Sequence, residues 1–122
     1  ASVQDNYMNV REYSSFFRIL YNASYLNKEM SEKALKILSE VDYKDGLVAG
    51  VPKNVVVSHK FGERTYDNND TKQLHDCGIV YHPQSPYLLC VMSRGDSLIK
   101  EAKVISEVSK FVYDEVNNYA SK

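Results

Sequence analysis

Three short apolar runs in the middle of the chain constrain its fold more than any other feature. They occupy residues 55–57, 77–81 and 87–93 and are rich in β-branched or aromatic residues, which favour strands. Residues 65–73 are polar and rich in Asn and Asp, which indicates a flexible connection. Residues 82–86 contain two prolines and predict a hairpin loop. Because both connections are too short for a crossover helix, we expect three antiparallel strands.

Two helices are predicted before these strands. Asn9 and Glu12 have the spacing of a capping box, and apolar side chains then recur at helical spacing to about residue 21, namely Val10, Tyr13, Phe16, Phe17 and Leu20. A second helix is predicted to begin at Ser31, with Ala34 and Leu38 on its apolar face together with Leu35. Residues 42–53 contain two glycines and a proline, which predict a loop.

A long helix is predicted to close the chain. Asp96 is placed to cap it, and one apolar stripe runs along it, formed by Leu98, Ala102, Ile105, Val108, Val112 and Val116. The element order is therefore two helices, three strands and one long C-terminal helix. This order predicts an α+β fold in which an antiparallel sheet is flanked by helices. Its 122 residues are enough for one domain, residues 1–122, or for part of one.

Composition excludes several classes of protein. The chain has 15 Lys and Arg against 16 Asp and Glu, a formal net charge of −1, so it lacks the basic footprint of a nucleic-acid-binding protein. Its longest apolar runs, such as residues 87–92, are too short to span a membrane. Residues 1–9 are polar and contain no signal-peptide core, so an address for export would lie upstream of them.

The cysteines and histidines carry no clear chemical signature. Cys77 and Cys90 fall in neighbouring apolar runs, where a bridge would depend on the strand register. We expect two buried free thiols there, because free cysteine commonly behaves as a small core residue. His59, His75 and His82 are isolated and lack metal-ligand spacing. We therefore expect neither a metal site nor a cofactor.

One segment carries a specific resemblance. Residues 54–63, NVVVSHKFGE, pass from an apolar strand into polar residues and contain the triplet Lys60, Phe61 and Gly62. The chain resembles the C-terminal part of class A β-lactamases and low-molecular-weight penicillin-binding proteins. There, two helices precede an active-site strand with a Lys-Thr/Ser-Gly box, and a hairpin and a long helix follow. Residues 76–95, DCGIVYHPQSPYLLCVMSRG, are similar to the hairpin, and residues 45–52 to the approach to the strand.

The resemblance implies roles for the residues around the box. Lys60 is expected to hold a substrate carboxylate and to help move a proton during acylation. Gly62 is expected to let the substrate backbone lie close to the strand. The amide N–H of Glu63 is expected to form half of an oxyanion hole. Phe61 departs from the family, because it lacks the hydroxyl that binds the substrate carboxylate, and Arg64 or Thr65 is the nearest substitute.

The family's nucleophile motif, Ser-x-x-Lys, is matched literally by the residues from Ser97 to Lys100. We reject this match, because the family's nucleophile precedes the box by a long helical region, whereas Ser97 begins the closing helix. The Tyr-x-Asn matches that begin at Tyr25 and Tyr66 carry little weight in a chain rich in both residue types. We therefore expect the nucleophile to lie outside this sequence and the isolated chain to be inactive.

The resemblance also predicts partners. The family's sheet has five strands, and two of them pair beside the last strand of this chain, residues 87–93 (Tyr87 to Ser93). We expect that edge to take the N-terminal part of the same enzyme or a second copy of the chain. The implied function is a serine hydrolase acting on β-lactams or D-Ala-D-Ala peptides in the bacterial periplasm or cell envelope. The alternative is a non-catalytic binding or structural protein with the same fold, which Phe61 makes plausible.

Overall fold

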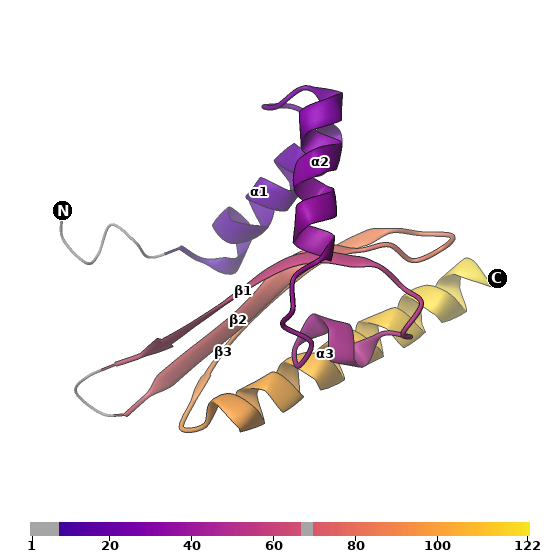
Figure 1. The fold of residues 1–122 in the computed structure, drawn as a ribbon. Helices are drawn as coiled ribbons and strands as arrows, with labels where there is room; N and C mark the ends of the chain where they lie inside the picture. Colours follow the sequence, from indigo (N-terminus) through magenta and orange to yellow (C-terminus); the bar gives the residue numbers. More distant parts are fainter. Residues whose placement is uncertain (1–7, 67–69) are drawn as a thin grey trace.

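The computed structural model describes residues 8–66 and 70–122 (Figure 1). Along the chain it contains helices α1 (Val10–Asn22) and α2 (Lys28–Ser39), a short 3-10 helix η2 (Leu47–Gly50), strands β1 (Val57–Thr65), β2 (Lys72–Val80) and β3 (Tyr87–Gly95), and helix α3 (Leu98–Ala120). The predicted α+β class and element order are confirmed. The 3-10 helix lies inside the segment that was predicted to be a loop.

The strands form one antiparallel sheet in the order β1-β2-β3. Lys60 of β1 is opposite Cys77 of β2, and Cys77 is opposite Cys90 of β3. Each strand has nine residues, so all three are longer than predicted, and β1 begins at Val57, two residues later than predicted. The polar connection is correspondingly shorter, because cross-strand pairing continues to Thr65 and Lys72. The middle of that connection, residues 67–69, lies outside the described residues.

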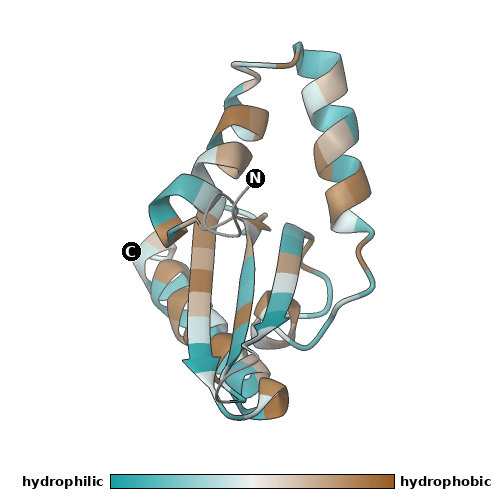
Figure 2. Cartoon of the chain, turned by 90° about the vertical axis from the view of Figure 1, so that its left-hand side faces the viewer, coloured by the Kyte–Doolittle hydropathy of each residue, from teal (hydrophilic) through white to brown (hydrophobic). Residues whose placement is uncertain are grey.

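Helices cover both faces of the sheet. Helices α1 and α2 lie over one face, and α3 with η2 lies over the other (Figure 1). Hydrophobic and hydrophilic stretches lie along the strands without strict alternation, because helices cover both faces of the sheet (Figure 2). The α3 side holds a buried cluster of Leu47, Val57, Leu74, Val80, Ala102 and Ile105. The α1 side holds a smaller cluster of Phe17, Leu35, Cys77 and Ile79.

Helix α1 begins as the sequence predicts. Its capping box is complete: Glu12 N donates to Asn9 Oδ1 at 2.8 Å, and Asn9 N donates to Glu12 Oε2 at 3.2 Å. The predicted start of α2 at Ser31 is wrong. The helix begins one turn earlier, at Lys28, because Asn27 caps it by accepting a 2.8 Å hydrogen bond from Met30 N.

Helix α3 differs from the prediction at its cap and on one position of its buried face. The N-cap is Ser97, which accepts from Lys100 N at 3.3 Å, whereas Asp96 forms only an exposed ion pair with Lys100. Val108 was predicted to be buried but is 37% exposed. Ser109 is buried instead, because its hydroxyl donates a 2.7 Å hydrogen bond to the carbonyl of Leu47. A polar residue thus joins the buried face by satisfying a carbonyl of η2.

The prediction of two free thiols is wrong. Cys77 and Cys90 are joined in a disulfide, with their α-carbons 3.9 Å apart. The strand register makes them direct partners across β2 and β3, on the side of the sheet that α1 covers. The sequence could not show this, because a shift of one residue in register would separate the two sulfur atoms.

Candidate active site along the open edge of strand β1

Two hydrogen bonds show which main-chain groups of β1 are available. Just before the strand, Val56 accepts from Tyr81 N at 3.0 Å, and just after it Tyr66 donates to Thr71 O at 2.8 Å. Residues that bond to the neighbouring strand alternate with residues that do not. Even-numbered residues of β1 therefore bond to β2. The odd-numbered residues turn their N–H and C=O groups to the other edge, which no strand in the described residues occupies.

Lys60 places a positive charge at this open edge. Its side chain is exposed, and Nζ donates a 2.6 Å hydrogen bond to the carbonyl of Phe61, one of the odd-numbered residues. The same side chain borders a cavity of about 240 Å³ under α1, which is lined mainly by apolar groups of Tyr13, Phe16, Phe17, Leu20 and Leu38. The ammonium group itself lies at the strand edge, 5.1 Å from the centroid of the Phe61 ring.

Glu63 brings a free amide to the same edge. It is two residues beyond Phe61, so its N–H points in the same direction as the Phe61 carbonyl. Gly62 lies between them and bonds to β2, with its α-carbon facing the α1 side. The Lys60 ammonium, the Phe61 carbonyl and the Glu63 amide therefore follow one another along a single edge.

The side chain of Phe61 leaves β1 on the opposite face from that of Lys60, and the Lys60 ammonium reaches over the strand edge towards the ring. The ring stacks on Tyr43 with ring centroids 4.0 Å apart and an angle of 13° between the planes. Burial, followed by the charges of Asp76, Asp45 and Glu63, raises the pKa of Tyr43 to about 12. The aromatic residue that replaces the family's Thr or Ser is therefore part of the packing between β1 and the segment before η2.

Arg64 and Thr65 take different positions. Arg64 shares the face of Lys60 and Gly62, and its guanidinium carbon lies 5.2 Å from the ring centroid of Tyr66. It borders a cavity of about 210 Å³ whose lining includes Gly62, Glu63, Gln73, His75 and Met92. Thr65 is exposed at the last position of β1. Of these two predicted donors, Arg64 is the one on the side of the sheet where Lys60 lies.

His75 lies beside the predicted site and was not predicted from the sequence. It is opposite Gly62 in the sheet, and its ring contacts the edge of Tyr13 at a centroid distance of 4.9 Å. Burial, followed by the positive charge of Lys60, lowers the pKa of His75 below its ordinary value, with Asp76 acting in the opposite direction. The ring is thus held in its neutral form next to the cation.

A second missed feature is a buried polar pair. His59 and Asp76 are 1% and 0% exposed, and Nδ1 of the histidine lies 2.8 Å from Oδ1 of the aspartate. A signal was present in the sequence: Val57, His59 and Phe61 alternate along one strand, so a polar residue stands in an apolar row. Its partner could not be chosen without the register.

Residues of the rejected Ser-x-x-Lys and Tyr-x-Asn matches cap helices. Ser97 caps α3 and follows β3, which β2 separates from β1. Asn27, the end of the first Tyr-x-Asn match, caps α2. The second match includes Asp67 and Asn68, which lie outside the described residues. The positions of Ser97 and Asn27 agree with the rejection of these motifs as catalytic.

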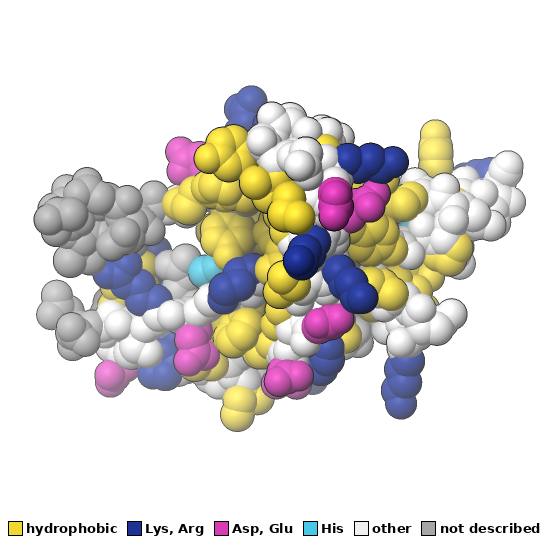
Figure 3. All heavy atoms as spheres, turned by 45° about the horizontal axis from the view of Figure 1, so that its top comes forward, with side chains coloured by type: hydrophobic (Ala, Val, Ile, Leu, Met, Phe, Trp, Pro, Cys, Tyr) yellow, Lys and Arg dark blue, Asp and Glu magenta, His cyan; other side chains and the backbone are white. Residues whose placement is uncertain are grey.

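The helical layer beside Lys60 presents apolar side chains to solvent. Figure 3 shows hydrophobic side chains gathered on the face that carries α1 and α2, with Lys and Arg among them. The exposed apolar residues of these helices include Phe16 at 54%, Tyr21 at 53% and Ile37 at 62%. No helix in residues 8–66 and 70–122 is long and apolar enough to cross a membrane.

Comparison of the sequence with models of known protein families identifies the family of this chain. A family model described as the beta-lactamase enzyme family matches residues 2–116, and the chain belongs to that family. The expected resemblance is thereby confirmed. No curated protein matches the chain in the corresponding search.

Solved structures show the same fold. A beta-lactamase from Chitinophaga pinensis DSM 2588 superimposes with a TM-score of 0.74 at 23% identity, over 84% of this chain and 40% of that one. PBP-A superimposes with a TM-score of 0.72 at 20% identity, over 88% of this chain and 39% of that one. A variant of PBP-A, solved as an acyl-enzyme complex with penicillin G, matches equally well. The chain therefore spans about two fifths of these neighbours' length.

Proposed function

We propose that this chain is the C-terminal portion of a serine hydrolase that acts on β-lactams or D-Ala-D-Ala peptides through an acyl-enzyme. The observation that carries the proposal is the order of groups on the open edge of β1. There the Lys60 ammonium donates to the Phe61 carbonyl, and the Glu63 amide follows on the same edge. The family membership and a penicillin acyl-enzyme among the structural neighbours support this assignment.

The groups on this edge suit acyl transfer. A serine hydroxyl supplied by the rest of the enzyme attacks the substrate carbonyl carbon, and negative charge develops on the carbonyl oxygen. The Glu63 N–H is a fixed donor for that oxygen, and it needs no reorganisation because the ladder to β2 leaves it unused. Lys60 holds the substrate carboxylate, and its positive charge favours loss of the serine proton, which is delivered to the leaving amide nitrogen as the C–N bond breaks. Collapse of the tetrahedral intermediate breaks the amide bond, and water later releases the acyl group.

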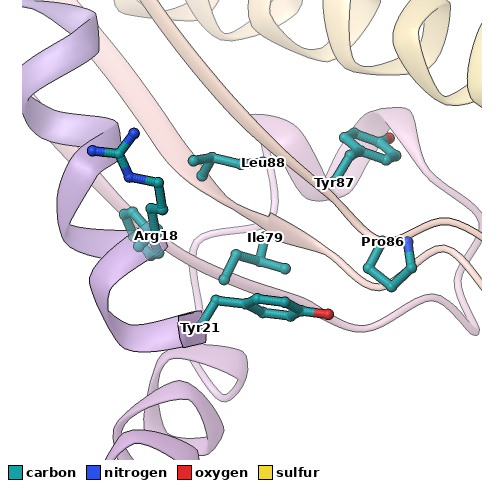
Figure 4. Close-up of a pocket in the computed structure, with 7 residues that line it drawn as sticks. Arg18, Tyr21, Ile79, Pro86, Tyr87 and Leu88 are labelled. Atoms are coloured by element: carbon teal, nitrogen blue, oxygen red, sulfur yellow. The ribbon is translucent and has the colours of Figure 1, made fainter. Parts of the chain in front are cut away.

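The rest of the enzyme is proposed to pack against the opposite edge, β3. Residues 87–93 carry no charge and no proline, the usual protections of an exposed strand edge. At the start of β3 a cavity of about 110 Å³ is lined by Arg18 and Tyr21 of α1, Ile79 of β2, and Pro86, Tyr87 and Leu88 (Figure 4). An added strand beside β3 would cover this cavity.

Helix α3 extends this surface on the other face of the sheet. Glu101 contacts Ser93 and lies against Gly95, so its side of the helix is turned towards β3. Val104 and Val108 follow at helical spacing and are 49% and 37% exposed. The β3 edge and the adjoining flank of α3 therefore form one surface that an additional segment, or a second copy of the chain, can cover.

Replacing the Glu63 amide tests the proposal directly. In the full-length polypeptide, Glu63→Pro removes the N–H at the open edge but no hydrogen bond to β2, and proline is tolerated on such edges. Acylation by penicillin, followed by intact-mass spectrometry, should slow by about 10²–10³-fold, the usual effect of losing one oxyanion donor. Glu63→Ala is the matched control, because it keeps the amide and removes only the exposed carboxylate. Equal rates for both variants would contradict the proposed role.

One observation favours a second candidate, a non-catalytic binding protein with this fold. Phe61 offers no hydroxyl to a carboxylate, and its ring is committed to the stack on Tyr43. The two candidates give different results with penicillin: the hydrolase forms a stoichiometric covalent adduct, and the binding protein forms none even at saturating ligand.

A further inference from the structure

The buried pair of His59 and Asp76 adjoins the proposed site: His59 precedes Lys60 in β1, and Asp76 is opposite Phe61 in β2. A carboxylate only accepts hydrogen bonds, so the hydrogen in the 2.8 Å contact is carried by His59 Nδ1. The second oxygen of Asp76 accepts from the amide of Leu47 at 2.9 Å. The Leu47 carbonyl in turn accepts from the Ser109 hydroxyl at 2.7 Å. All four side chains are buried, so one polar chain joins β1, β2, η2 and α3.

This chain of hydrogen bonds holds both residues that flank Lys60. His59 precedes Lys60, and Phe61, which follows it, is the cross-strand partner of Asp76. Both flanking residues are odd-numbered, so their main-chain groups face the open edge. Gly46 keeps the connection tight, because a β-carbon there would lie 2.5 Å from Asp76 Oδ2 and 3.0 Å from the ring of Tyr43, which stacks on Phe61. These contacts, on the face of the sheet that α3 and η2 cover, thus fix the main chain of β1 on either side of Lys60.

Stability alone does not account for the pair. His59 Nε2 is buried without a hydrogen-bond partner in residues 8–66 and 70–122. An unpaired buried polar atom is destabilising, and well-packed apolar residues commonly replace a buried polar pair without loss. Apolar residues could not replace the hydrogen bond between His59 of β1 and the Asp76 carboxylate that also binds the amide of Leu47.

We propose that His59 and Asp76 are positioning residues that hold the open edge of β1 in the geometry required for catalysis. The catalytic part of this inference rests on the proposed function. The pair contacts no substrate. It acts through the strand, by setting where the Phe61 carbonyl and the Glu63 amide lie relative to Lys60. Loss of the link should therefore affect the acylation step rather than the first binding of substrate.

Two substitutions at His59 separate the link from side-chain volume. His59→Asn keeps a donor at the position of Nδ1, whereas His59→Leu removes it. His82 supplies the matched control, because it is 2% exposed and bonded to Asn117, Gln84 and Ser85, but at the other end of the hairpin. In the full-length polypeptide, His59→Leu should lower the acylation rate constant by about tenfold or more, with the binding constant for penicillin nearly unchanged. His59→Asn should restore most of the rate, and His82→Leu should not lower it.

A second measurement does not depend on the proposed function. In nuclear magnetic resonance spectra of the 122-residue chain, the amide signals of Phe61 and Glu63 should shift or broaden in His59→Leu and stay in place in His59→Asn and His82→Leu. Asp76→Asn provides another variant of nearly equal volume. His59 and Leu47 bond to different oxygens of Asp76, and the NH₂ group that replaces one of them in asparagine cannot accept, so one of the two bonds is lost and the same edge signals should change.

The outcomes separate the two ideas. Unchanged edge signals in both His59→Leu and Asp76→Asn would overturn the positioning role, whatever penicillin does. A wild-type enzyme that penicillin never acylates would overturn the proposed function, while changed edge signals would still support the positioning role. Equal losses of acylation in His59→Leu and His82→Leu would show a general effect of destabilisation and overturn the specific link.

Discussion

The imidazole ring of His75 occupies the space beside the α-carbon of Gly62, its partner across β1 and β2. A β-carbon on residue 62 would lie 2.6 Å from Nε2 of that ring. The packing of His75 therefore favours glycine in the Lys-Phe-Gly triplet, besides the close approach of substrate that the family resemblance implies. The ring also contacts Tyr13 of α1, so it packs between that helix and β1.

Gly62→Ala should lower the free energy of unfolding by about 1–3 kcal/mol, because the His75 ring must leave its contact with Tyr13. The combined variant with His75→Ala should recover part of this loss, and a double-mutant cycle measured by urea unfolding gives the coupling. Gly95→Ala is the control, since its nearest neighbour would be 3.6 Å away, at ordinary contact distance. Strictly additive effects of Gly62→Ala and His75→Ala would contradict this explanation.

The stability of the chain should fall between pH 7 and pH 5 in a way that depends on His75. Its pKa is lowered by burial and by Lys60, so the unfolded chain takes up the proton more readily than the folded chain as the pH falls below the ordinary value of 6.5. This group contributes a slope of at most about 1.4 kcal/mol per pH unit. Urea unfolding at several pH values should show a shallower decline in His75→Gln. An identical decline in both proteins would rule out this cause.

The fold was predictable where local patterns were sufficient. The capping box at Asn9 and the apolar face of α1 specify that helix without help from the rest of the molecule. The errors arose where tertiary contacts decide: Ser109 replaces Val108 on the buried face of α3 because the Leu47 carbonyl needs a donor. The disulfide depended on a strand register that the runs of apolar residues leave open.

The candidate site was predicted only in part. Lys60, Gly62 and Glu63 were chosen through the resemblance to the family's triplet. That the amide of Glu63 faces the open edge while Gly62 bonds to β2 follows from the hydrogen-bond pattern of β1, which the sequence does not show. His75 and Asp76 could not be chosen, because their importance comes from what faces them across the sheet. The available signal was a polar residue at a strand position whose neighbours on the same face are apolar. Two such residues on neighbouring strands are a pattern to search for in related sequences.

The isolated chain should associate through β3. Leu88 is 39% exposed at this edge and lines the adjoining cavity, so Leu88→Lys should shift the species seen in sedimentation at micromolar concentration towards monomer. Val91 is less suitable for this test, because it packs against the core on the α3 side. Ile37→Lys, on α2, is the control and should leave the association unchanged. A wild-type monomer with slow amide exchange along β3 would mean that the edge is already covered.

Ser97 should prove to be structural. Its hydroxyl caps α3, so Ser97→Ala should lower stability by about 1 kcal/mol, as the loss of an N-cap commonly does. The 122-residue chain should form no covalent adduct with penicillin, because the proposed nucleophile is not part of it. Urea unfolding checks the loss of stability, and peptide mapping after incubation with labelled penicillin checks the absence of an adduct. Label on Ser97 would show that the literal Ser-x-x-Lys motif is functional.

The role of Lys60 is the central claim, and its acylation kinetics test it most directly. Lys60 lies in the middle of β1 with its side chain exposed, so Lys60→Ala should change the free energy of unfolding by less than about 0.5 kcal/mol. In the full-length polypeptide the same variant should slow acylation by penicillin by about 10²-fold or more, since the charge is used in the transition state. An acylation rate equal to that of the wild type, or a loss of rate matched by a loss of stability, would contradict the account.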